Sequence, residues 1–224
     1  MNDAQRPPGG EPYGWPSERP PADEAYRWRA TPASAPRAPR RRWRLAVYLF
    51  LGTVASTFVA NYIWSVDVGR ALGYSAAIMS ILLLHEMGHF LMCLRYGVPA
   101  TPPYFIPLPL PPFGTLGAVI LMPPRQRSLR SILDIGAAGP LAGLVVAIPV
   151  AYLGLKLSTV VDAGELELEG GIRLGDSILF WLISRVALGD LPATGEIILH
   201  PVALAGWAGL FLTGLNLLPI GQLD

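Results

Sequence analysis

The sequence predicts an all-α polytopic membrane protein with about four transmembrane helices, a proline-rich re-entrant loop or hairpin, and a disordered N-terminal tail. The 224 residues are 52% hydrophobic and only 15% charged, whereas soluble domains carry about 25% charged residues. The apolar residues gather in long runs, as membrane helices require. The net charge of +1 gives no field that favours nucleic acid, and a single cysteine excludes an internal disulfide.

Two domains are expected from the composition. Residues 1–44 are rich in proline and arginine, cannot bury an apolar core, and are predicted to be a disordered cytosolic tail. Residues 45–224 are predicted to be embedded in the membrane. The first apolar segment could instead be a cleaved signal peptide, but the tail before it is far longer than the n-region of a signal peptide.

Four apolar segments, residues 45–66, 72–94, 132–155 and 201–218, are each close to the length needed to cross a bilayer, about 20 residues. A weaker apolar run, residues 177–188, contains Arg185 and is too short to cross. We expect it to form an amphipathic helix at the membrane interface.

The arginines predict the orientation. They crowd the front of the first segment, end the second at Arg95, and precede the third, and the positive-inside rule places these ends in the cytosol. The loop at residues 162–171 is acidic and is expected outside. One orientation satisfies every loop, with a cytosolic N-terminus and a membrane of the bacterial inner or plasma type.

Residues 98–122 are apolar but contain seven prolines, so they cannot form a regular helix. Irregular backbone at membrane depth is tolerated only where protein buries it or where it lines a cavity. This predicts a re-entrant loop or hairpin beside a site, with Gly114 and Gly117 permitting tight turns. The alternative is an apolar surface loop on the inner leaflet.

The second segment contains His85, Glu86 and His89 in the sequence HEMGH. Histidines four apart lie on one face of a helix, where both can bind one tetrahedral zinc ion. Glu86 lies about 100° further around the helix, at the edge of that face, where it can accept a proton from the attacking water. A polar cluster inside a membrane helix is costly, so function is favoured over a structural hydrogen-bond cluster.

A zinc site needs a further ligand, and three residues are candidates. His200 opens the fourth segment at the expected outer face, which does not match the depth of the histidine pair. Asp134 could bind metal, pair with an arginine such as Arg130, or serve as a structural polar group. Asp224 follows Pro219 and Gly221, which break the helix at matching depth, and it is the preferred third ligand.

The motif HEMGH at residues 85–89, followed by NLLPIGQLD at residues 216–224 and with AAGPLAG at residues 137–143 between them, resembles the site-2 protease family of intramembrane zinc metalloproteases. The resemblance covers about residues 72–224. In some members an asparagine stands where this chain has Gly143. The family motif continues beyond the aspartate, so by the resemblance we expect the sequence to end before the domain does.

The resemblance implies that His85, His89 and Asp224 bind Zn²⁺ and that Glu86 is the general base. It implies that Asn216 positions the substrate or stabilises the oxyanion; the alternative for Asn216 is a helix–helix hydrogen bond. The implied reaction is hydrolysis of a peptide bond in or near a transmembrane helix of a membrane-protein substrate, such as a membrane-tethered regulator.

A helical peptide bond is protected by its own hydrogen bonds, so a substrate must unwind locally before it is cleaved. The hairpin could hold the unwound segment by strand addition, with Gly114, Thr115 and Gly117 as the substrate-binding residues. The expected partners are therefore this substrate and the lipid bilayer, without nucleic acid. Two alternatives stay open: an inactive relative that binds membrane partners, and a metal transporter, which would need more polar residues along the helices.

Overall fold

The structure, a computed structural model, describes residues 41–122, 128–162, 174–175, 177–190, 192 and 195–217. The predicted tail lies outside these residues except at its end, where residues 41–44 are helical. The first helix thus begins four residues before the predicted boundary at residue 45. Pro39 is the last proline before the helix, and arginine is a good helix former, so nothing interrupts a helix that begins at Arg41.

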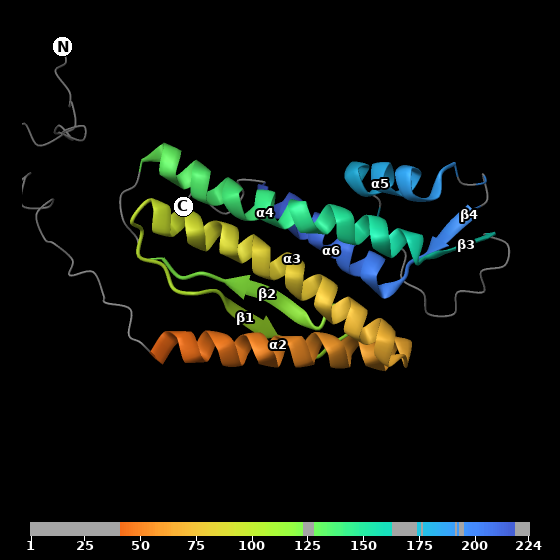
Figure 1. Ribbon diagram of the computed structural model, residues 1–224, viewed down its shortest axis with the longest axis horizontal. Helices are drawn as coiled ribbons and strands as arrows, with labels where there is room; N and C mark the ends of the chain where they lie inside the picture. Colours follow the sequence, from red (N-terminus) through yellow and green to blue (C-terminus); the bar gives the residue numbers. More distant parts are fainter. Residues whose placement is uncertain are drawn as a thin grey trace, which may run out of the picture. The chain divides into compact units, whose positions relative to one another are not determined.

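The described residues form five helices and two two-stranded sheets (Figure 1). The helices are α2 (Arg41–Ser65), α3 (Val68–Arg95), α4 (Leu129–Lys156), α5 (Ile178–Leu188) and α6 (Pro201–Leu217). All five predicted helical segments are therefore confirmed as helices. By length and composition, three of the described helices can cross a membrane: α2 from Trp43, α3 and α4. Helices α5 and α6 are apolar but shorter.

Three of these helices begin at a capping residue, and for α3 and α4 this residue lies outside the predicted apolar run. The Asp67 carboxylate accepts a hydrogen bond from the Arg70 N–H at 2.8 Å and caps α3. Ser128 caps α4 and Ser177 caps α5 in the same way. Such side chains satisfy N–H groups that have no partner inside the helix. Helices α3 and α4 therefore extend a few residues beyond the apolar segments on which the prediction was based.

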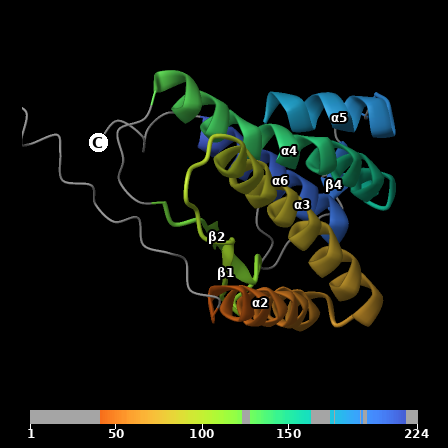
Figure 2. The ribbon, with the colours of Figure 1, turned by 60° about the vertical axis from the view of Figure 1, so that its left-hand side comes forward.

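Helices α3, α4 and α6 pack together, and α2 packs on α3 (Figures 1 and 2). Glycines permit close approach of α4 to α6: a Cβ at Gly154 would lie 2.2 Å from the Ala203 nitrogen, and a Cβ at Gly206 would lie 2.5 Å from the Ala151 Cα. Ile81 of α3 is fully buried in the same apolar core. Small residues at helix interfaces let backbones approach closely, which is typical of helices packed in lipid.

Strands β1 (Tyr104–Pro107) and β2 (Thr115–Val119) form an antiparallel hairpin, with an irregularity after Phe105. Figures 1 and 2 show it beside α2 and α3. The Phe105 ring is buried and meets the Phe50 ring of α2 edge to face at 5.2 Å. The predicted hairpin is thus confirmed, and it runs alongside two of the candidate spans.

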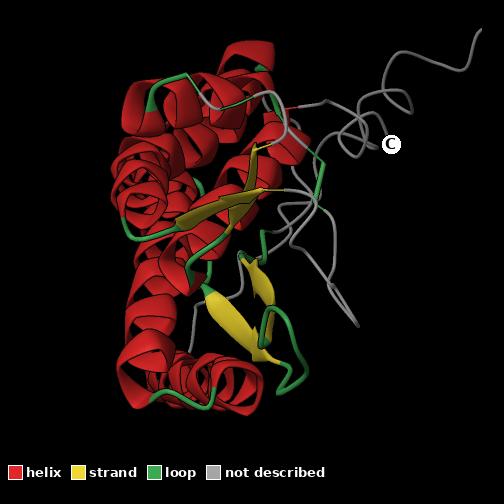
Figure 3. Ribbon diagram, turned by 90° about the vertical axis from the view of Figure 1, so that its right-hand side faces the viewer, coloured by secondary structure: helices red, strands yellow, loops and turns green. Residues whose placement is uncertain are grey.

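The second sheet pairs β3 (Thr159–Asp162) with β4 (Gly195–Ile198), also antiparallel. Figure 3 shows the two sheets as separate units. The second sheet lies at the end of α4, while the start of α2, the end of α3 and the start of α4 gather at the other end (Figure 1). This pairing was missed at the sequence level, although Thr159, Val160 and Val161 form a β-branched run typical of a strand.

Candidate functional site

The predicted metal-binding pair lies on one face of α3, as expected. The Nε2 atoms of His85 and His89 face each other at 3.3 Å, and the two rings are 5.0 Å apart between centroids. His85 is 1% exposed and Glu86 is 8% exposed, so both are buried in the helix packing, whereas His89 is half-buried. Polar side chains in this position must find partners inside the protein.

The orientation of the His89 ring is fixed by the backbone of α4. Its Nδ1 atom lies 2.7 Å from the carbonyl oxygen of Ile135. A carbonyl can only accept, so Nδ1 carries the proton and donates it, and Nε2 is left with a free lone pair. A donor bond from the second ring nitrogen to a backbone carbonyl is the arrangement that orients most metal-binding histidines.

Two glycines of α4 make room for the imidazole rings. A Cβ at Gly139 would lie 2.1 Å from His89 Nε2, and a Cβ at Gly143 would lie 3.0 Å from His85 Nδ1. Gly88 of α3 leaves room for the backbone of α4, because a Cβ there would lie 2.4 Å from the Ala138 carbonyl oxygen. The two glycines of the segment AAGPLAG are thus explained by the space that they leave for the rings, and Gly143 contributes no polar group.

Asn216 reaches the same pair from α6, since its Nδ2 atom lies 2.9 Å from His85 Nε2. With the amide nitrogen donating, His85 Nε2 is an acceptor and the ring proton lies on Nδ1. This Nδ1 is buried and has no hydrogen-bond partner in the described part of the chain. Neither Nε2 atom then carries a proton, and the two lie 3.3 Å apart; a shared cation would stabilise this arrangement by taking the His85 lone pair that Asn216 engages here.

The distance between the two nitrogens fits a shared zinc ion. Two nitrogen ligands at about 2.0–2.1 Å from a tetrahedral zinc lie about 3.3 Å apart, which is the separation of the two Nε2 atoms. Within the described ranges, no three residues among His, Cys, Asp and Glu come together as a metal site. The preferred third ligand, Asp224, lies outside the described residues, as do residues 218–223.

His200, the less favoured candidate, caps α6 at the opposite end of α3 from the motif. Its Nδ1 accepts the Val202 N–H at 3.3 Å, and its own N–H donates to Ser158 Oγ at 2.9 Å. Burial, and then the positive charge of Arg70, lower the pKa of His200. Val202, two residues after His200, packs beside Gly73 of α3, where a Cβ would lie 3.2 Å from it. Gly73 is twelve residues from His85, which is about 18 Å along the helix.

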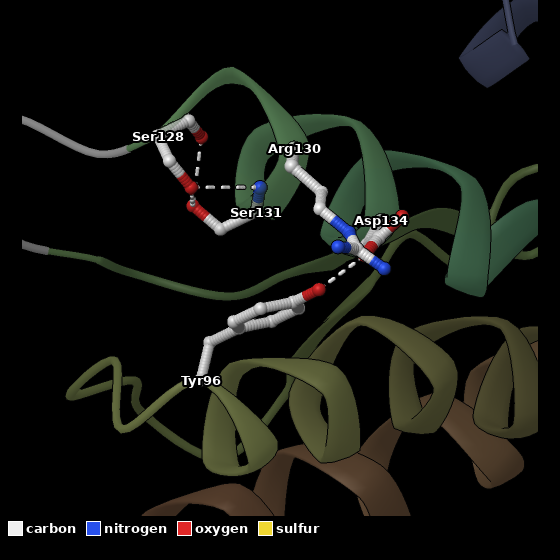
Figure 4. A network of polar contacts seen from close by, with 5 residues as sticks. All are labelled: Tyr96, Ser128, Arg130, Ser131 and Asp134. Atoms are coloured by element: carbon white, nitrogen blue, oxygen red, sulfur yellow. Dashed lines mark hydrogen bonds and ion pairs between the residues drawn. The ribbon is translucent and has the colours of Figure 1, made fainter.

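Asp134 pairs with Arg130, which was one of the predicted alternatives, and also with Tyr96. It accepts a hydrogen bond from the Tyr96 hydroxyl, and its Oδ2 lies 3.9 Å from Arg130 Nε (Figure 4). The Asp134 carboxylate, by accepting this bond, raises the pKa of Tyr96. The Tyr96 contact was missed at the sequence level, because the two residues are 38 positions apart.

The hairpin residues predicted to bind substrate differ in their surroundings. Gly114 is buried with φ +74°, and a Cβ there would lie 2.5 Å from the Thr57 Cα of α2. Thr115 Oγ1 donates to the Ile106 carbonyl oxygen at 3.0 Å and accepts the Gly117 N–H at 3.0 Å. A Cβ at Gly117 would meet nothing within 4 Å, so this position is open.

The tip of the hairpin is tied to both neighbouring helices. Ser56 Oγ of α2 donates to the Gly114 carbonyl oxygen at 2.7 Å, and the Tyr74 hydroxyl of α3 donates to the Phe113 carbonyl oxygen at 3.0 Å. In the described sheet β2 pairs only with β1. The other edge of β2 has no strand partner among the described residues.

Comparisons with known proteins agree with this geometry. The family model of Peptidase family M50 matches residues 73–224. The chain is 37% identical over 163 residues to "Probable zinc metalloprotease EGY1, chloroplastic" of Arabidopsis thaliana, covering 70% of this chain and 29% of that protein. It is 31% identical over 161 residues to "Probable zinc metalloprotease EGY2, chloroplastic" of the same plant, covering 68% of this chain and 27% of that protein.

The chain thus spans less than a third of the length of these curated relatives. No solved structure matches it. The family match covers the motif HEMGH, the glycines of α4 and the end of α6, which are the segments that build the site. The resemblance to the site-2 proteases is confirmed, and this chain belongs to Peptidase family M50.

Proposed function

We propose that this chain carries the zinc site of a membrane metalloendopeptidase, which hydrolyses a peptide bond in or near a transmembrane helix of a membrane-protein substrate. The observation that carries the proposal is the pair of unprotonated Nε2 atoms of buried His85 and half-buried His89, 3.3 Å apart. Family membership supports it, and so do the names of the relatives, which are zinc metalloproteases.

His85, His89 and Asp224 would hold the ion. When bound, zinc supplies a Lewis acid that polarises the scissile carbonyl and makes water more acidic. Glu86 is the general base: a carboxylate oxygen takes a proton from the attacking water and later delivers it to the nitrogen of the leaving amine. The burial of Glu86 beside the pair supports this role, because few water molecules compete there for the carboxylate.

Asn216 would donate from its amide to the developing oxyanion or to the substrate. Its contact with His85 supports a place at the site, and the same contact is also a helix–helix hydrogen bond. The two roles are separable. An Asn216→Ala variant that keeps its zinc and its stability but loses about 10²–10³ in kcat supports the oxyanion role, whereas a loss of stability alone supports the structural one.

The hairpin would hold the unwound substrate as an added strand along the open edge of β2, with Gly114, Thr115 and Gly117 in the binding segment. The anchoring of its tip on α2 and α3 supports a rigid edge of this kind. A cysteine in place of Leu116, the exposed neighbour of Gly117 on β2, should crosslink in an inactive variant to a cysteine near the scissile bond of the substrate; Gly117 itself has φ +93° and does not tolerate a side chain without strain. A cysteine at Gly52 of α2, which meets nothing within 4 Å, should not.

We further propose that α6 is a fourth crossing, that the N-terminus is cytosolic, and that the protein resides in an inner or plasma membrane. Arg95 and Arg130 lie at the end of the molecule where α3 ends and α4 begins. The excess of arginine at this end supports the orientation.

Replacing Glu86 with Gln should leave zinc binding intact and remove cleavage. The amide has nearly the shape of the carboxylate but cannot accept the proton, so a loss of at least about 10²-fold is expected. The measurement is zinc content by mass spectrometry together with cleavage of a model transmembrane substrate by the full-length protein. Unchanged cleavage would contradict the general-base role, and an inactive wild type with zinc would favour an inactive relative.

Replacing Gly139 with Ala should weaken zinc binding, because the new methyl group would lie 2.1 Å from His89 Nε2 and force the ring aside. A fall in affinity of about 10–100-fold is expected, as for other changes that misorient a ligand. Gly214→Ala on α6 is the matched control, since a Cβ there meets nothing within 4 Å. Equal zinc affinity in both variants would show that α4 does not set the position of His89.

A further inference from the structure

Tyr96 and Asp134 join the end of α3 to the start of α4 at the membrane-flanking end of the site. The Tyr96 hydroxyl donates to Asp134 Oδ2, and Arg130 lies 3.9 Å from the same oxygen (Figure 4). Tyr96 is the C-cap of α3, and Asp134 lies in the second turn of α4. We call Tyr96, Asp134 and Arg130 the polar clamp. It connects residues 38 positions apart in the sequence, so it is a tertiary contact.

The clamp lies next to the group that orients His89. Asp134 directly precedes Ile135, whose carbonyl oxygen accepts the His89 Nδ1 proton at 2.7 Å. On α3, Tyr96 follows His89 by seven residues, which is two helical turns or about 10 Å along the same face. One face of α3 therefore carries both the clamp and the metal-binding pair.

The contacts between α3 and α4 form an antiparallel series along this face. From the clamp inward, His89 meets Ile135 and Gly139, Gly88 meets Ala138, and His85 meets Gly143. The inner contacts are packing of glycine against rings or backbone. These contacts set the distance between α3 and α4. They do little to stop one helix from sliding along the axis of the other, because glycines have no side chains that interlock. The directional bonds in this series are those of His89 and of the clamp.

We propose that Tyr96 and Asp134 are positioning residues for His89: their hydrogen bond fixes the axial position of α4 and so holds the Ile135 carbonyl where it orients the imidazole. The inference rests on the proposed function, since it assumes that the ring is oriented for a metal ion. Arg130 supports the clamp by keeping the Asp134 carboxylate beside it.

The test is Co²⁺ binding to the metal-free, full-length protein in detergent, followed by the visible absorption of the ion, which reports its ligand geometry. Tyr96→Phe removes the donor but keeps the ring, and should lower Co²⁺ affinity about three- to tenfold, less than the 10–100-fold typical of direct partners of a ligand. It should also change the absorption spectrum. Tyr152→Phe, on α4 near its other end, is the matched control and should match wild type.

Changes at Asp134 separate positioning from general stability. Asp134→Asn retains an oxygen that accepts the Tyr96 proton, so it should bind Co²⁺ close to wild type, whereas Asp134→Ala should behave like Tyr96→Phe. Tyr96→Phe and Asp134→Ala each remove the same hydrogen bond. The double variant should therefore lose no more Co²⁺ affinity than either single variant. This combination of rescue and non-additivity is not expected of two unrelated losses of stability.

Three results would overturn the inference. If wild type binds Co²⁺ and Tyr96→Phe shows the same affinity and spectrum, the clamp does not position His89, while the proposed function stands. If wild type binds no Co²⁺ and His89→Ala changes nothing, the proposed function fails and the inference fails with it. Additive losses in the double variant would also contradict the shared hydrogen bond.

Discussion

The hydrogen bond from His89 Nδ1 to the carbonyl oxygen of Ile135 sets how two helices must meet. A ring nitrogen inside apolar packing is costly to leave unpaired, so half-buried His89 needs a partner for its Nδ1. In this protein the partner is the backbone of α4, so α4 must lie close to α3. That closeness is possible only where both helices lack side chains, at Gly88, Gly139 and Gly143. The hydrogen bond of the His89 ring thus explains why these three positions on α3 and α4 are glycine.

Once α3 and α4 are this close, α6 completes the enclosure. It packs against α4 through Gly154 and Gly206 and presents Asn216 to His85. The three helices together exclude most of the surroundings from the pair, so that His85 is 1% exposed. The hairpin, by contrast, is held on the outer side by α2, through Ser56 and the Phe50 ring. The pair is therefore enclosed by α3, α4 and α6, while the hairpin is fixed to α2 and α3.

Much of this could be predicted from the sequence because it depends on local patterns. Apolar runs gave the helices, prolines gave the hairpin, and the four-residue spacing placed His85 and His89 on one face. What the sequence could not reveal is pairing across distance. The Ile135 carbonyl belongs to a residue with no polar side chain, and the bond between Tyr96 and Asp134 joins positions far apart. The pairing of β3 with β4 was missed for the same reason: each strand is only four residues long.

The N-terminal caps of the helices were also missed at the sequence level, although they shift the predicted helix ends by only a few residues. Asp67 and Ser128 are polar, so a count of apolar residues stops before them, yet they determine where α3 and α4 begin. The glycines are the opposite case. AAGPLAG was noticed as a family segment, but its physical role, the absence of atoms where the histidine rings lie, became evident only from the distances in the folded chain.

The central claim is that His85 and His89 together bind one zinc ion. X-ray absorption spectroscopy of the zinc-loaded, full-length protein tests it most directly, because imidazole rings give a characteristic scattering pattern. The account predicts two imidazole nitrogens at about 2.0–2.1 Å from the metal, with the contribution of one ring lost in His89→Ala. A spectrum without imidazole scattering, or one unchanged in His89→Ala, would contradict it.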